Sequence, residues 1–183
     1  MRKFLPAAAV LVAALTITGV ALAGHLRPLI PFGDANITIS GDSARVVVGD
    51  GQYGGVYDGK AVSKRIGQIK ALSFVSSGDV GGGAPRWSIP IDTDGHKNTT
   101  EGYAFLDAAG CGAVNGTNDS GQATVVSTKN DACHVNFQSA DYANWTTFAA
   151  VHPNYRTSKD VPFVIADTPG DYFVSVVRFY QDK

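Results

Sequence analysis

The stretch RWSIPI (residues 86–91) leads into the acidic turn DTDGH (92–96), and YAFLD (103–107) follows shortly afterwards. Apolar, aromatic and β-branched residues dominate both outer pieces, which is typical of strands. The Asp-x-Asp-Gly sequence between them is ordinary turn chemistry. The stretch therefore predicts two neighbouring strands at the centre of the fold, joined by an acidic turn.

The chain's two cysteines, Cys111 and Cys133, follow this segment and bound a Gly- and Asn-rich stretch. A metal pair or a catalytic thiol is the alternative to a disulfide, but the cysteines are far apart and His134 is the only soft ligand nearby. We therefore predict a disulfide, as expected of a protein that leaves the cytoplasm. Closing a loop of this length stabilises a fold by about 3 kcal/mol.

Other segments share the period-two alternation or the β-branched composition of strands, namely 36–40, 45–48, 66–75, 122–127, 132–137, 161–166 and 172–180. The Gly-rich segments 49–59 and 76–84 predict loops. One helix is expected over 141–151, capped by Ser139 or Asp141 and stopped by Pro153. The pattern predicts an all-β fold, an antiparallel, jelly-roll-like β-sandwich with one short helix. A single domain over 35–183 is expected.

The N-terminus carries Arg2 and Lys3, an almost unbroken apolar run, and Ala21-Leu22-Ala23. This is the pattern of a cleavable signal peptide over residues 1–23, and its compact, Ala-rich form indicates a bacterial exporter. An uncleaved membrane anchor is the alternative. Residues 24–34 predict a lead-in segment that stays loose or lies along the domain. We expect a secreted, extracellular protein without membrane insertion after cleavage.

The charge of the chain argues against two classes of partner. The sequence has 15 basic and 16 acidic residues, and residues 1–23 hold two of the basic ones and no acid. Cleavage would leave 13 basic and 16 acidic residues, a net charge of −3. Nucleic acids and anionic membranes attract clustered Lys and Arg instead. We therefore expect neither as a partner.

The acidic turn is a candidate metal site. Asp92, Asp94 and Glu101, with Asp107 across the hairpin, could supply hard oxygen ligands to calcium. The twelve-residue calcium loop is not satisfied, because its sixth position is Lys97 rather than Gly. Ordinary turn chemistry is the alternative interpretation. Calcium is the one cofactor that the sequence leaves open.

Aromatic residues form a second candidate site. Trp87, Tyr103, Tyr53 and Tyr57 could stack on the apolar faces of sugars, while Trp145 is expected to dock the helix. Trp87 could equally belong to the core. Tyr53 and Tyr57 lie in a predicted loop with little around them, which leaves a binding role open.

The pattern predicts no catalytic residues. There is no G-x-S-x-G and no H-E-x-x-H, and the four histidines are scattered along the chain. At the level of fold, the chain resembles secreted β-sandwich modules, including carbohydrate-binding ones. The first hypothesis is therefore a non-catalytic binding module for an extracellular glycan. The second is a cell-surface or assembly-forming protein that contacts other proteins and can self-associate. An extracellular hydrolase is the weakest of the three.

Overall fold

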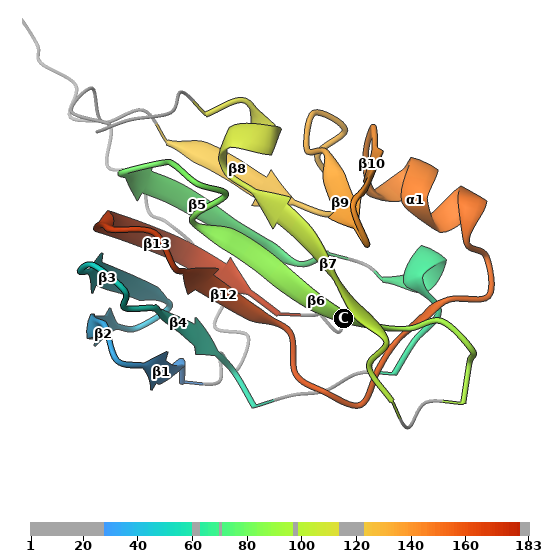
Figure 1. Cartoon of the computed structure of the whole chain (residues 1–183), viewed down its shortest axis with the longest axis horizontal. Coiled ribbons are helices and arrows are strands. Elements are labelled where there is room, and N and C mark those ends of the chain that lie inside the picture. The colour runs from blue at the N-terminus through green and yellow to red at the C-terminus, as the bar shows by residue number, and fades with distance from the viewer. Residues whose placement is uncertain (1–27, 60–62, 70, 97–98, 114–122, 180–183) are drawn as a thin grey trace, which may run out of the picture.

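Two antiparallel sheets and one α-helix make up the described part of this computed structural model, which covers residues 28–59, 63–69, 71–96, 99–113 and 123–179. The sheets lie face to face and share one core, so the fold is β-sandwich-like (Figure 1). The predicted signal peptide lies outside the described residues. No helix in the described ranges is long and apolar enough to cross a bilayer.

The larger sheet has the strand order β1-β4-β12-β6-β7-β9-β10, with β11 paired to β6. Its strands are β1 Ile30–Gly33, β4 Gly54–Tyr57, β6 Arg86–Asp92, β7 Gly102–Asp107, β9 Val135–Phe137, β10 Ala140–Tyr142, β11 Arg156–Thr157 and β12 Phe163–Ala166. The smaller sheet has the order β2-β3-β13-β5-β8. Its strands are β2 Asn36–Ser40, β3 Ser43–Val48, β5 Ser73–Gly78, β8 Thr124–Ser127 and β13 Gly170–Arg178.

The predicted central hairpin is present as β6 and β7. They pair antiparallel from Arg86 opposite Asp107 to Ile91 opposite Gly102. The odd-numbered residues of β6 face the smaller sheet, and Trp87 is fully buried there against Phe74 and Phe179. The even-numbered residues face the other way. The core side of the larger sheet is therefore the side that carries the odd-numbered residues of β6.

The glycine-rich segment 49–59, predicted as a loop, contains strand β4. A Cβ added to Gly55 would lie 2.0 Å from the carbonyl oxygen of Val164 on the neighbouring strand. At Gly54, an added Cβ would lie 2.6 Å from the Ala35 side chain. The prediction was wrong because these glycines serve close approach between chain segments, which composition alone does not distinguish from a flexible turn.

Segment 66–75, predicted as one strand, begins with a 3₁₀ turn over Ile66–Gln68, and β5 starts only at Ser73. The carbonyl of Ile66 accepts a hydrogen bond from the Trp145 indole at 3.0 Å. This contact ties the turn to the helix α1 (Trp145–Val151). Docking of the helix therefore overrides the strand propensity of the segment.

The helix is shorter than predicted. Neither Ser139 nor Asp141 caps it, because the chain first forms β10. The cap is Asn144, whose side chain accepts a hydrogen bond from the Thr147 amide at 2.8 Å. Gln138, like Ser139, has a positive φ, so these two residues turn the chain from β9 into β10.

The predicted disulfide is confirmed. Cys111 and Cys133 are joined, which links the 3₁₀ turn Ala109–Cys111 to the segment before β9. The described part of the lead-in segment contains β1, which pairs with β4 at the edge of the larger sheet. It therefore lies along the domain and is part of the sheet.

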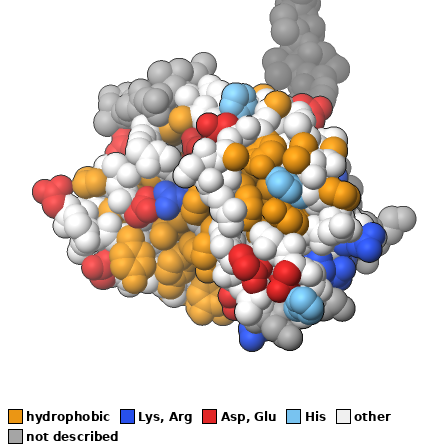
Figure 2. All heavy atoms as spheres, turned by 45° about the vertical axis from the view of Figure 1, so that its right-hand side comes forward, with side chains coloured by type: hydrophobic (Ala, Val, Ile, Leu, Met, Phe, Trp, Pro, Cys, Tyr) orange, Lys and Arg blue, Asp and Glu red, His pale blue; other side chains and the backbone are white. Residues whose placement is uncertain are grey.

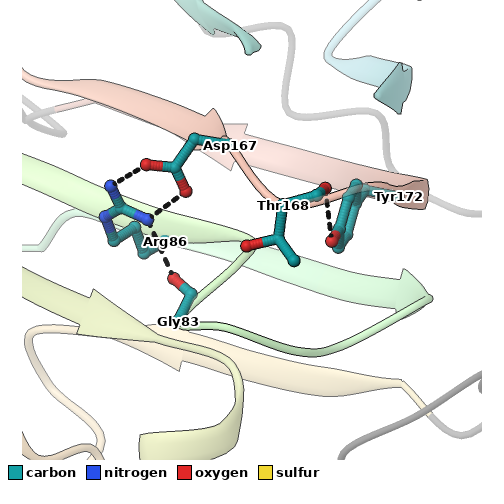
Figure 3. Close-up of polar contacts among 5 residues, drawn as sticks. All are labelled: Gly83, Arg86, Asp167, Thr168 and Tyr172. Carbon is teal, nitrogen blue, oxygen red and sulfur yellow. Dashed lines mark hydrogen bonds and ion pairs between the residues drawn. The ribbon is translucent and has the colours of Figure 1, made fainter. Parts of the chain in front are cut away.

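A buried tyrosine fixes the turn before the last strand (Figure 3). The hydroxyl of Tyr172 donates a hydrogen bond to the carbonyl of Thr168, four residues earlier, at 2.8 Å. Only 1% of Tyr172 is exposed, so no water replaces this bond. The arrangement is that of a tyrosine corner, a feature of β-sandwich domains.

We expect Tyr172→Phe to lower the free energy of unfolding by about 1 kcal/mol, because the Thr168 carbonyl loses its donor while packing is kept. Denaturant unfolding measures the change. Tyr53→Phe, at a residue that is 47% exposed, is the matched control and should leave stability unchanged. An equal loss in both variants would contradict the assignment.

Candidate functional site

Five aromatic side chains lie on the outer face of the larger sheet, away from the core. We call them the aromatic layer, and they are Phe32, Tyr57, Phe163, Tyr103 and Phe105. They come from β1, β4, β12 and β7, and all five are partly exposed. Hydrophobic side chains gather in a broad patch on the left of the face shown in Figure 2.

The layer covers small residues of the strands beneath it. Phe163, Ser88 and Phe105 are directly opposite one another on β12, β6 and β7. Ser88 is only 2% exposed although it faces outward, because large rings flank it on both sides. At the edge of the sheet, the Phe32 ring occupies the space that a side chain at Gly55 would need. Large rings above small residues make the layer compact.

The rings contact one another in a continuous row. Phe32 lies 6.1 Å from Tyr57 and 5.3 Å from Phe163, measured between ring centroids. Phe163 in turn lies 5.7 Å from Tyr103, which lies 6.5 Å from Phe105. These distances are in the range of favourable aromatic pairs, so the rings support each other as well as the sheet.

A charged pair marks the Phe105 end of the layer. The guanidinium of Arg86 lies 5.2 Å from the centre of the Phe105 ring. It donates two hydrogen bonds of 2.6 Å to the Asp167 carboxylate and a third, of 3.2 Å, to the Gly83 carbonyl (Figure 3). The hydrogen bond from Arg86 holds the pKa of Asp167 below its usual value. These bonds thus hold the Arg86 side chain in place beside the Phe105 end of the layer.

Tyr103 has a polar neighbour on the other side of the layer. Burial raises the pKa of its phenol, and the negative charge of Asp160 raises that pKa further. The exposed Asp160 carboxylate accepts a hydrogen bond from the Thr100 hydroxyl at 2.6 Å. A hydroxyl donor and a carboxylate acceptor beside an aromatic face are groups that can orient a sugar.

The structure places the predicted aromatic residues in different environments. Tyr57 and Tyr103 belong to the aromatic layer. Tyr53 is 47% exposed in the turn before β4 and makes no ring contact with the layer among the described contacts. Trp87 was assigned wrongly, because it is fully buried between the sheets and presents no face to a ligand. Trp145 docks the helix, as expected.

The predicted carboxylates come together in part. Asp92, Asp94 and Glu101 each place an oxygen within 4.8 Å of the others. Asp107 does not join them, because it lies directly across from the Arg86 backbone, at the opposite end of the hairpin. The three clustered carboxylates therefore offer hard oxygen ligands of the type that calcium binds.

The same carboxylates also hold the turn together. Asp92 accepts a hydrogen bond from the Gly95 amide at 2.6 Å, and Glu101 accepts one from the Thr93 amide at 2.8 Å. Asp94 pairs with His96, which lowers the pKa of Asp94 and raises that of His96. Turn formation thus accounts for much of the cluster without a bound ion.

Three members of the layer, Phe32, Phe105 and Phe163, were not predicted as site residues. Phe105 and Phe163 each lie on a strand where they alternate with buried residues, and this alternation is visible in the sequence. Phe32 lies on β1, whose residues are all at least partly exposed, so no such alternation marks it. What the sequence hides is that β12 and β7 flank β6, which brings Phe163 and Phe105 to the same face.

Comparisons of this chain with family models, with curated proteins and with solved structures find no match.

We expect Asp167→Asn to lower the melting temperature at neutral pH, because Arg86 loses its charged partner. The folded-state pKa of Asp167 is depressed, so its contribution is complete above the ordinary Asp pKa and is lost as the pH falls through the folded value. The difference in melting temperature between wild type and variant should therefore shrink in acid. Asp50→Asn, at an exposed residue, should show no such trend.

Calcium bound at the carboxylate cluster would raise the melting temperature relative to a sample in chelator. We expect Asp94→Asn to abolish that difference, whereas Asp107→Asn, at the opposite end of the hairpin, should retain it. Differential scanning fluorimetry measures both. Superimposable wild-type melts in calcium and chelator would exclude a calcium site here.

Proposed function

We propose that this protein is an exported, non-catalytic binding module that holds a glycan on the aromatic layer. The observation that carries the proposal is a continuous row of five partly exposed rings on the sheet face that the core does not use. Aromatic rings offer apolar faces of the kind that pack against the C–H faces of sugars. Such a row is larger than the scattered apolar residues of an ordinary surface.

Two further features support this proposal. The layer is bordered by Arg86 and Asp167 near Phe105 and by Asp160 near Tyr103, which supply donors and acceptors for hydroxyl groups. The disulfide between Cys111 and Cys133 suits an oxidising compartment outside the cytoplasm. Secretion from a bacterium and jelly-roll connectivity remain parts of the proposal.

We expect Tyr103→Ala and Phe163→Ala to weaken retention of the bound glycan. Loss of one stacking contact of about 1 kcal/mol weakens binding roughly fivefold. Phe173→Ala is the matched control, because Phe173 is 41% exposed on the smaller sheet, away from the aromatic layer. Affinity electrophoresis against a glycan panel measures retention, and circular dichroism confirms that each variant is folded.

Retention that is equal in all three variants would contradict the assignment of the layer.

A second candidate function, protein contact through the same layer, is favoured by its apolar character. It predicts self-association that Phe163→Ala abolishes, without selectivity for any glycan. Light scattering on wild type and variant distinguishes the two functions.

A further inference from the structure

The ring planes of the aromatic layer are not parallel. Phe32 is inclined by 56° to Tyr57 and by 82° to Phe163. Phe163 is inclined by 63° to Tyr103, and only Tyr103 and Phe105, two residues apart on β7, come close to parallel at 17°. No plane can therefore meet the faces of more than a few of these rings.

The packing opposes rotation of the rings into one plane. Ring atoms of Phe32 lie 2.7 and 2.8 Å from the point where a Cβ of Gly55 would be, so the ring fills that space. Phe163 is held between Phe32 and Tyr103 by edge-to-face contacts on both sides. Flattening the row would break these favourable edge-to-face contacts.

The row also has a direction. It begins on β1 and crosses β4, β12 and β6 before it ends on β7. Four spacings between neighbouring strands amount to roughly 19 Å. An elongated ligand that lies across the strands can touch every ring, whereas a single sugar unit covers only part of the row.

We infer that the layer binds a single soluble glycan chain laid across the strands, and not the flat surface of a crystalline polysaccharide. This inference rests on the proposed function. A chain in solution can turn about its glycosidic bonds, so successive units can meet rings of different inclination. A crystal surface holds its chains in one plane and contacts only rings that share that plane.

The test compares soluble and crystalline probes on the same protein. Isothermal titration with cellohexaose, xylohexaose and chitohexaose measures binding of single chains. Sedimentation with crystalline cellulose and crystalline chitin measures binding to a flat surface. We expect at least one hexasaccharide to bind more tightly than its disaccharide by tenfold or more, and no depletion by either crystal. Phe163→Ala should lose most of the hexasaccharide affinity, whereas Phe173→Ala should keep it.

Each remaining outcome overturns a definite statement. Depletion by a crystalline polymer, with or without binding of a hexasaccharide, overturns the inference and leaves glycan binding in place. Equal affinity for disaccharide and hexasaccharide also overturns it, because the ligand would then touch only one part of the row. No binding to any probe overturns the inference and the proposed function together.

Discussion

The structure depends on one constraint, the division of β6 between two unlike faces. Its inward residues are large, and Trp87, Ile89 and Ile91 are all fully buried in the core. Its outward residues Ser88 and Pro90 are small, which leaves room for rings from both neighbouring strands. The strand alternates with period two, so a slip of one residue would bury the wrong set. Core and aromatic layer therefore share a single register.

This division also explains why Trp87 misleads a reading of the sequence. Tryptophan is common both in sugar-binding sites and in cores, and its neighbours Arg86 and Ser88 are polar on either side. Only the presence of the smaller sheet decides which face of β6 is buried. Truncation of a buried tryptophan costs about 3–5 kcal/mol. Loss of binding in a Trp87 variant would therefore report on folding rather than on a site.

The strand and disulfide predictions hold where the evidence is local. The β6–β7 pair follows from alternation and turn chemistry, and the disulfide follows from two cysteines in a chain that begins with a predicted signal peptide. The predictions fail where distant contacts decide the outcome. Gly55 lies in a strand because Val164 approaches it, and Ile66 forms a turn because Trp145 binds its carbonyl. The aromatic layer was only partly predicted for the same reason, since β12 comes much later in the sequence than β7 and yet pairs with the opposite edge of β6.

The outward row of β6 connects the two candidate sites. It begins at Arg86 beside Phe105, passes under the rings at Ser88 and Pro90, and ends at Asp92 in the carboxylate cluster. The aromatic layer thus lies between a fixed cation and a group of carboxylates on one rigid strand. Rigid placement on strands limits the side-chain entropy lost on binding. A ligand laid across the strands on the rings would therefore lie between hydrogen-bonding groups at the two ends of β6, and this gives the sheet face a polarity that a uniform apolar patch lacks.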